Sequence, residues 1–78
     1  MMTLDEFFEH FLEELDVVDL KDIDTSTNFI SIPGWDSINA LIIIAMIEEK
    51  FDVSLNSSDL EQSKTIEDLY KLIQNKMR

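Results

Sequence analysis

The chain has 78 residues, no cysteine and a formal net charge of −11, from 17 acidic and 6 basic side chains. A chain of this length is expected to form one domain, residues 1–78, around a single modest core. The lack of cysteine excludes disulfides, thiolate metal ligands and a cysteine nucleophile. The negative charge argues against binding of nucleic acid or of an anionic membrane, and it favours protein partners with basic surfaces.

Targeting and membrane segments are not evident in the sequence. The N-terminal residues lack a basic region followed by a long apolar run. The longest apolar run, Ala40 to Ile47, is too short to cross a bilayer. We therefore expect a soluble, cytoplasmic protein, and we separately expect it to be a monomer.

The first predicted element is a helix from about Leu4 to Asp16. Its apolar residues recur at helical spacing and form one stripe, made of Leu4, Phe7, Phe8, Phe11, Leu12 and Leu15. Thr3 and Glu6 have the spacing of a capping box, in which each side chain satisfies a free backbone amide at the helix start.

A long loop is predicted from Val17 to Trp35, where the helical periodicity fails. It is rich in turn-forming residues: Asp24, Thr25, Ser26, Thr27, Asn28, Pro33 and Gly34. Long loops in compact domains are typically functional. Its apolar residues are expected to anchor it to the helices: Ile23, Phe29, Ile30 and Ile32.

Three further helical segments follow the loop. One runs from about Ser37 to Phe51 with Asp36 as N-cap, and a short turn is expected near Ser58 to Gln62. The last starts after Thr65, which forms a weaker capping box with Asp68. Its inward residues are expected to be Ile66, Leu69, Ile73 and Met77. No stretch alternates with a period of two, so the fold class is all-α: a four-helix bundle of three longer helices and one short helix.

The predicted second helix has more apolar surface than one core requires. One face is the expected core stripe, made of Ala40, Ile43, Ile44, Ile47 and Phe51. The roughly opposite face is also apolar: it consists of Ile38, Leu41 and Ala45, with Ile42 beside them and the carboxylates of Glu48 and Glu49 flanking. Either this second face docks partner proteins, or the helix is buried nearly all round.

Ser37 is predicted to lie exposed in the first turn of this helix. Gly34 permits a tight backbone approach, and Asp36 can cap the first free amides. A phosphate attached to Ser37 would lie near the positive end of the helix dipole, although the charge of Asp36 opposes it. An Asp-Ser pair alone is an ordinary helix start. Whether Ser37 is instead a modification site therefore depends on the residues around it.

That surrounding pattern resembles the acyl carrier protein family. The family pattern is a long loop that ends in Gly-x-Asp-Ser-Leu, followed by a helix that closes with an acidic pair and Phe. The matching segment here is GWDSINALIIIAMIEEKF, from Gly34 to Phe51. The resemblance covers nearly the whole chain and includes Phe29, Val53, Leu55, Thr65, Ile66, Leu69 and Ile73.

The resemblance implies a carrier rather than an enzyme. Ser37 would receive 4′-phosphopantetheine from coenzyme A, through a separate phosphopantetheinyl transferase. The thiol of this arm would hold an acyl group as a thioester, for fatty-acid or specialised lipid or polyketide-type biosynthesis. Partner enzymes would dock on the second helix, at Ile38, Leu41, Ile42, Ala45 and Glu48.

Three positions depart from the pattern of fatty-acid carriers. Such carriers usually have Ala at the position of Trp35, and they often have acidic residues at the positions of Asn39 and Ile42. On this comparison the docking face is less charged than usual. That favours a free-standing carrier of a specialised pathway, loaded with an unusual acyl or aminoacyl group. Trp35 is expected to pack over the loop, with contact to the arm or a partner as the alternative.

The same residues are compatible with other functions. An aminoacyl or peptidyl carrier of the same fold, or an unmodified acidic interaction module, would share most of this sequence pattern. A hydrolase would need a base beside Ser37, but the lone His10 falls among glutamates on the polar side of the first helix. No metal site is predicted: Asp22 and Asp24 resemble the start of a calcium loop, but Pro33 stands in the place of its final glutamate.

Overall fold

A computed structural model describes residues 2–15 and 20–77, and within these ranges the fold is all-α, as predicted. Its elements are α1 (Leu4–Glu14), the 3₁₀ helix η1 (Phe29–Ser31), α2 (Ser37–Phe51), α3 (Ser57–Ser63) and α4 (Ile66–Lys76). The described residues contain no strand, and one isolated β-bridge joins Asn28 to Thr65.

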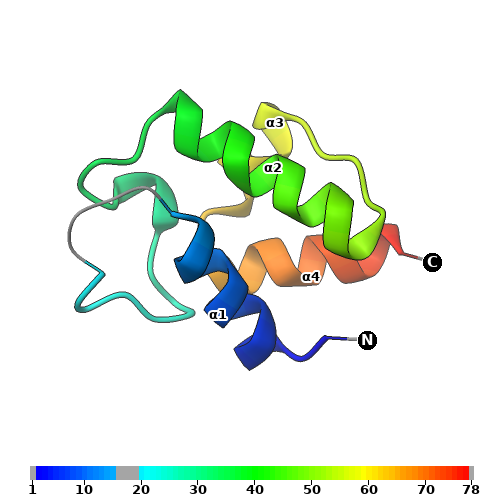
Figure 1. Ribbon diagram of the computed structural model, residues 1–78, viewed down its shortest axis with the longest axis horizontal. Helices are drawn as coiled ribbons and strands as arrows, with labels where there is room; N and C mark the ends of the chain where they lie inside the picture. The colour runs from blue at the N-terminus through cyan, green and yellow to red at the C-terminus, as the bar shows by residue number, and fades with distance from the viewer. Residues whose placement is uncertain (1, 16–19, 78) are drawn as a thin grey trace.

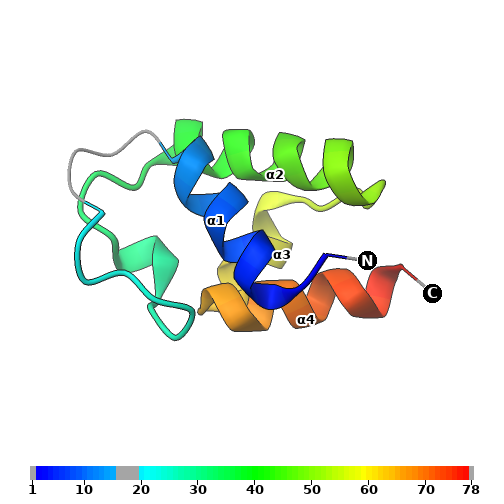
Figure 2. The same ribbon diagram turned by 60° about the horizontal axis from the view of Figure 1, so that its bottom comes forward.

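The helices form a small bundle in which α1 and α3 each pack against both α2 and α4. Figure 2 shows α2 above α4, with α1 and α3 between them. The first and last described residues lie toward one end of the molecule, and residues 20–35, which lead into α2, form the other end (Figure 1). The first turn of α2 therefore lies at the loop end, away from the first and last described residues.

Side-chain caps fix where the helices begin. The predicted capping box at α1 is confirmed: Thr3 Oγ1 accepts from the Glu6 N–H, and Glu6 Oε1 accepts from the Thr3 N–H at 2.9 Å. This second bond, the largest cause, holds the pKa of the Glu6 carboxyl below its ordinary value of 4.5. Asp36 caps α2 as predicted. At α4, Thr65 Oγ1 accepts from the Asp68 N–H, which is the capping half of the predicted box.

The core is a single apolar cluster with contributions from every helix. Its fully buried residues are Phe7, Phe11, Phe29, Ile43, Ile47, Ile66, Leu69 and Ile73. Aromatic rings pack edge to face within it, with Phe7 against Phe51 and Phe11 against Phe29. Each such side chain contributes about 1.5–3 kcal/mol through burial of its apolar surface. Burial thus joins helices that are individually too short to be stable in water.

Several predicted boundaries need correction. Helix α1 ends at Glu14, with Leu15 as its extended C-cap, while Asp16 lies outside the described residues. Helix α3 begins at Ser57, because Asn56 and Asp59 form a capping box that the sequence analysis missed. Met77 follows the end of α4 and is exposed, so it does not face inward.

The connection between α1 and α2 is anchored along residues 23–35; Val17 to Asp19 lie outside the described residues. Phe29 and Ile32 are buried and Ile23 is half-buried, as expected, whereas Ile30 is exposed. The short turn of η1 places Phe29 inward and Ile30 outward, which a reading as irregular loop could not predict. Backbone bonds from the Phe29 N–H to Lys64 O and from the Glu67 N–H to Thr25 O hold this segment against the start of α4.

Candidate functional site

Ser37 is the first residue of α2, and it is exposed, as the sequence predicts. The chain reaches it through a tight turn, in which the Trp35 N–H donates to Ile32 O at 3.0 Å. Gly34 has a φ of 92°, a conformation that residues with a Cβ adopt at a cost. Asp36 then has extended backbone, so Ser37 stands where the loop meets the helix.

Two backbone amides in the first turn of α2 have no acceptor within the part of the chain that the structure describes. Asp36 Oδ1 accepts from the Asn39 N–H at 2.9 Å, and Asp36 O accepts from the Ala40 N–H at 3.1 Å. No described residue accepts from the N–H groups of Ser37 and Ile38. Free amides at the positive end of a helix dipole suit an anion such as a phosphate, and a group on Ser37 Oγ would lie beside them.

A pocket of about 290 Å³ opens beside Ser37. It lies between η1, the start of α2 and α3, and its lining residues are Ile30, Trp35, Asp36, Ser37, Ala40, Ser57, Leu60 and Glu61. The apolar residues suit an aliphatic group, and the two carboxylates add negative charge at the site. The exposed Ile30, which does not anchor the loop, thus forms part of the surface around Ser37.

Trp35 takes part in both the packing and the pocket. Its indole is half-buried, stacks on Phe11 and meets Phe29 edge to face at 5.2 Å between ring centroids. The expectation that Trp35 packs over the loop is therefore confirmed. Because the same side chain lines the pocket beside Ser37, the packed position also leaves it close to the candidate site.

The second apolar face of α2 is open to solvent. Ile38 is 60 % exposed and Leu41 is 66 % exposed; Ala45 and Glu48 are also exposed, while Ile42 is half-buried. These exposures exclude the alternative that α2 is buried nearly all round. From Ser37 to Ile47 the helix carries no charged residue, and its exposed acidic residues, Glu48 and Glu49, follow in the last turns.

The inward face of α2 is rotated slightly from the predicted stripe. Ile43, Ile47 and Phe51 are buried as expected, but Ala40 and Ile44 are only half-buried. Asn39 and Met46 are buried instead. The direction of the inward face depends on where α1 and α3 pack, which a helical-wheel projection of α2 alone cannot supply.

Asn39 is a functional candidate that the sequence analysis misplaced. The sequence pattern places Asn39 among the positions that reduce the charge of the docking face, but only 2 % of it is exposed. Its amide Nδ2 donates to Gly34 O at 3.2 Å and to Asp36 Oδ1 at 3.1 Å. Asn39 therefore belongs to the inner side of the loop–helix junction. The signal that could have found it is its place as the third residue after a predicted N-cap.

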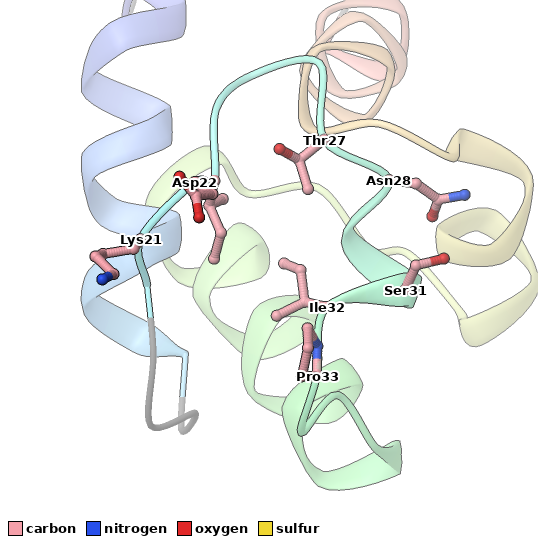
Figure 3. Close-up of a pocket in the computed structure, with 8 residues that line it drawn as sticks. Lys21, Asp22, Thr27, Asn28, Ser31, Ile32 and Pro33 are labelled. Atoms are coloured by element: carbon pink, nitrogen blue, oxygen red, sulfur yellow. The ribbon is translucent and has the colours of Figure 1, made fainter.

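A second, larger pocket of about 380 Å³ lies within the loop itself. Figure 3 shows Lys21 and Asp22 on one limb of the loop, and Ile32 and Pro33 on the other. Next to it, hydrogen bonds from the Ser26 hydroxyl and N–H to Asp24 Oδ1 hold the pKa of this carboxyl below its ordinary value of 3.8. Asp24 thus stabilises a turn of the loop.

The remaining candidates do not converge on Ser37. His10 Nδ1 lies 3.4 Å from Glu13 Oε1 on its own helix, which agrees with a surface role. Among residues 2–15 and 20–77, no group of three or more His, Asp or Glu side chains is placed to hold a metal ion. No helix in these ranges has the length and apolar composition needed to span a bilayer.

Comparison with known proteins identifies relatives over most of the chain. Residues 5–73 match the family described as "Phosphopantetheine attachment site". The acyl carrier protein of Campylobacter jejuni is 32 % identical over 75 residues, which cover 96 % of each chain. That of Desulforapulum autotrophicum is 30 % identical over 64 residues, or 82 % of this chain and 83 % of the relative. That of Chlamydia muridarum is 34 % identical over 56 residues, or 72 % of this chain and 73 % of the relative. No solved structure matches the chain.

Proposed function

Since this chain belongs to the acyl carrier protein family, we propose that Ser37 is the residue to which 4′-phosphopantetheine is attached. Proteins of this family bear that group covalently and act as carriers, not as catalysts. The observation that carries the assignment is the exposure of Ser37 at the start of α2, beside a pocket and directly after the capping residue Asp36.

The residues around Ser37 fit the phosphate end of such a group. The amides of Ser37 and Ile38 have no described protein acceptor, so they can donate to phosphate oxygens. Asp36 uses Oδ1 to cap the helix, which leaves its charge close to the phosphate. The exposed serine gives a transferase direct access to the hydroxyl. When attached, the arm supplies the thiol that binds the cargo as a thioester.

We further propose that the cargo is an acyl intermediate of fatty-acid or specialised lipid or polyketide-type biosynthesis. The names of the relatives support an acyl group, and the apolar lining of the pocket beside Ser37 suits an aliphatic chain. An aminoacyl or peptidyl cargo is the alternative within the same fold. Mass analysis of the loaded protein from its native cell distinguishes the two.

The partners follow from the family and from the exposed face of α2. Membership implies a phosphopantetheinyl transferase and biosynthetic enzymes as partners. We propose that they dock on a face of α2 next to Ser37, which consists of Ile38, Leu41, Ile42, Ala45 and Glu48. The apolar part of this docking face lies nearest to Ser37, and Glu48 lies toward the far end, where a basic residue of the partner would pair with it.

Intact-mass spectrometry tests the attachment site. The purified protein, incubated with coenzyme A and a phosphopantetheinyl transferase, should gain the mass of one phosphopantetheine, and Ser37→Ala should abolish the gain. Ser57→Ala is the matched control, because Ser57 is also exposed, also begins a helix and lines the same pocket. A gain that survives in Ser37→Ala, or is lost in Ser57→Ala, would contradict the assignment.

An unmodified interaction module is the second candidate, because the exposure of Ile38 and Leu41 by itself indicates a protein-binding surface. The two candidates differ in their requirement for Ser37. If the protein is an unmodified module, its Ser37→Ala variant should bind the partner as well as the wild type does. If several competent transferases add no mass to the wild-type protein, the module is favoured.

A further inference from the structure

Asn39 ties the end of the loop to the first turn of α2 from the inside. Together with Ser63 it is a buried polar residue of the described chain. Its main-chain N–H and its side-chain Nδ2 both donate to Asp36 Oδ1, at 2.9 Å and 3.1 Å, and Nδ2 also donates to Gly34 O at 3.2 Å. These bonds close the backbone between Gly34 and Asn39 into one compact unit, and Ser37 projects from its outer side.

The start of α2 reverses the hydrogen-bond pattern found at two other helices of the chain. In α1 and α3 the third helical residue is acidic, Glu6 or Asp59, and its carboxylate accepts from the N–H of the capping residue. In α2 the third residue donates instead, to the carboxylate of its cap. The group it faces beyond the cap, Gly34 O, is an acceptor as well. Only a donor satisfies both partners.

We propose that Asn39 is a positioning residue that holds Ser37 in the orientation required for attachment of the phosphopantetheine group. Asn39 is buried and a docked enzyme cannot touch it, so its effect must pass through the junction that presents Ser37. The proposal rests on attachment at Ser37 and adds a requirement for an amide at position 39. Aspartate has nearly the same shape, but as an anion it has no hydrogen to donate.

The charges near Asn39 make this requirement testable by pH. Asp36 contacts its side chain, and Glu61 of α3 lies with Asp36 in the lining of the adjoining pocket. Both are carboxylates, so neither would stabilise an anion at position 39. Burial and the charge of Asp36 would together raise the pKa of an introduced aspartate. On acidification that side chain would become protonated and regain a donor.

The test compares Asn39→Asp with Asn75→Asp, which makes the same change at an exposed site on α4. With coenzyme A and a phosphopantetheinyl transferase near neutral pH, Asn39→Asp should lower the kcat/KM of attachment by about tenfold or more, because two buried hydrogen bonds are lost and a repulsion is added. Asn75→Asp should match the wild type. The kcat/KM of Asn39→Asp, divided by that of the wild type at the same pH, should rise as the pH is lowered from about 8 to about 5.5, because the introduced carboxyl takes up a proton.

Trp35 provides a readout that needs no attachment reaction. It is the single tryptophan of the chain and lies within the unit that Asn39 closes. The Asn39→Asp substitution should shift the fluorescence emission of Trp35 near neutral pH. The shift should reverse at low pH, while the helical circular dichroism is retained. Asn39→Ala, which removes the donors without adding charge, should slow attachment less and without this pH dependence, and it replaces Asn39→Asp if that variant does not fold.

The outcomes separate this inference from the proposed function. If the wild type gains no phosphopantetheine, the attachment site itself is wrong. If the wild type is modified and folded Asn39→Asp is modified equally fast, only the positioning role is overturned. The positioning role is also overturned if Asn39→Asp is modified slowly, but its kcat/KM relative to wild type does not change with pH and its Trp35 fluorescence is unchanged. A general loss of stability would then explain the lower rate.

Discussion

The indole of Trp35 lies parallel to the ring of Phe11, with 6.4 Å between the ring centroids and 4° between the planes. Phe11 is a fully buried residue of α1, and Trp35 directly precedes the Asp36-Ser37 pair. Helix α1 therefore contacts the candidate site through one aromatic pair. Fatty-acid carriers of the resembled pattern usually have alanine at this position, which could not make the contact.

Replacement of Trp35 should lower stability through the loss of this pair. Trp35→Ala should reduce the free energy of unfolding by about 2 kcal/mol, less than a fully buried tryptophan would lose, because Trp35 is only half-buried. Trp35→Phe keeps an aromatic ring and should lose less. Urea unfolding followed by circular dichroism measures both variants. Equal stability of Trp35→Ala and wild type would show that the stacking contributes nothing to folding.

Leu41 should matter for docking and not for folding. Leu41→Glu replaces an exposed apolar residue of the docking face, so it should raise the KM of a phosphopantetheinyl transferase by about tenfold while kcat changes little. Met77→Glu is the control, because Met77 is an exposed apolar residue at the end of α4. An equal rise in KM for both variants would indicate a general effect of added negative charge. No rise for Leu41→Glu would show that the transferase does not dock at Leu41.

Acid should weaken the start of α1 through Glu6. The pKa of Glu6 is lowered in the folded protein, because its carboxylate accepts from the Thr3 N–H. The carboxylate therefore contributes stability above its ordinary pKa of 4.5, and this contribution is lost as the pH falls through the lower folded value. Glu6→Gln keeps an acceptor but does not titrate, so its stability should fall less steeply with acid.

Thermal unfolding at a series of pH values below neutrality measures this difference. Glu9→Gln is the matched control, since Glu9 is an exposed glutamate of the same helix. If the stability of Glu6→Gln and that of wild type fall in parallel as the pH is lowered, then protonation of Glu6 does not weaken the protein, and the prediction is wrong. The titration of Glu6 followed by NMR gives the direction of its pKa shift directly.

The helices were predictable because the signals that start them are local. Thr3, Asp36 and Thr65 each precede an apolar pattern of helical period, and each is the N-cap that the structure contains. The bounds of α2 agree with the prediction at both ends. Ends without a strong local signal were predicted less well: α1 stops at Glu14 although the apolar pattern continues to Leu15.

Features that depend on contacts between distant segments were missed. The position of Ile30 beside the pocket follows from η1, which the segment forms while packed against the start of α4. The burial of Asn39 and Met46 follows from the places where other helices cover α2. The pocket beside Ser37 brings α3 residues such as Leu60 next to the loop, and no spacing in the sequence indicates that.

By itself, the sequence determined the helical class, the serine at a helix start and the excess of apolar residues on the second helix, because each depends on residues a few positions apart. Only the tertiary structure decided which of those apolar residues face water, that Trp35 stacks on Phe11, and that Asn39 turns inward to Gly34. The physical reason is that burial is a property of neighbours in space. A helical period shows that a helix has two faces, and the packing of the other helices selects which one is covered.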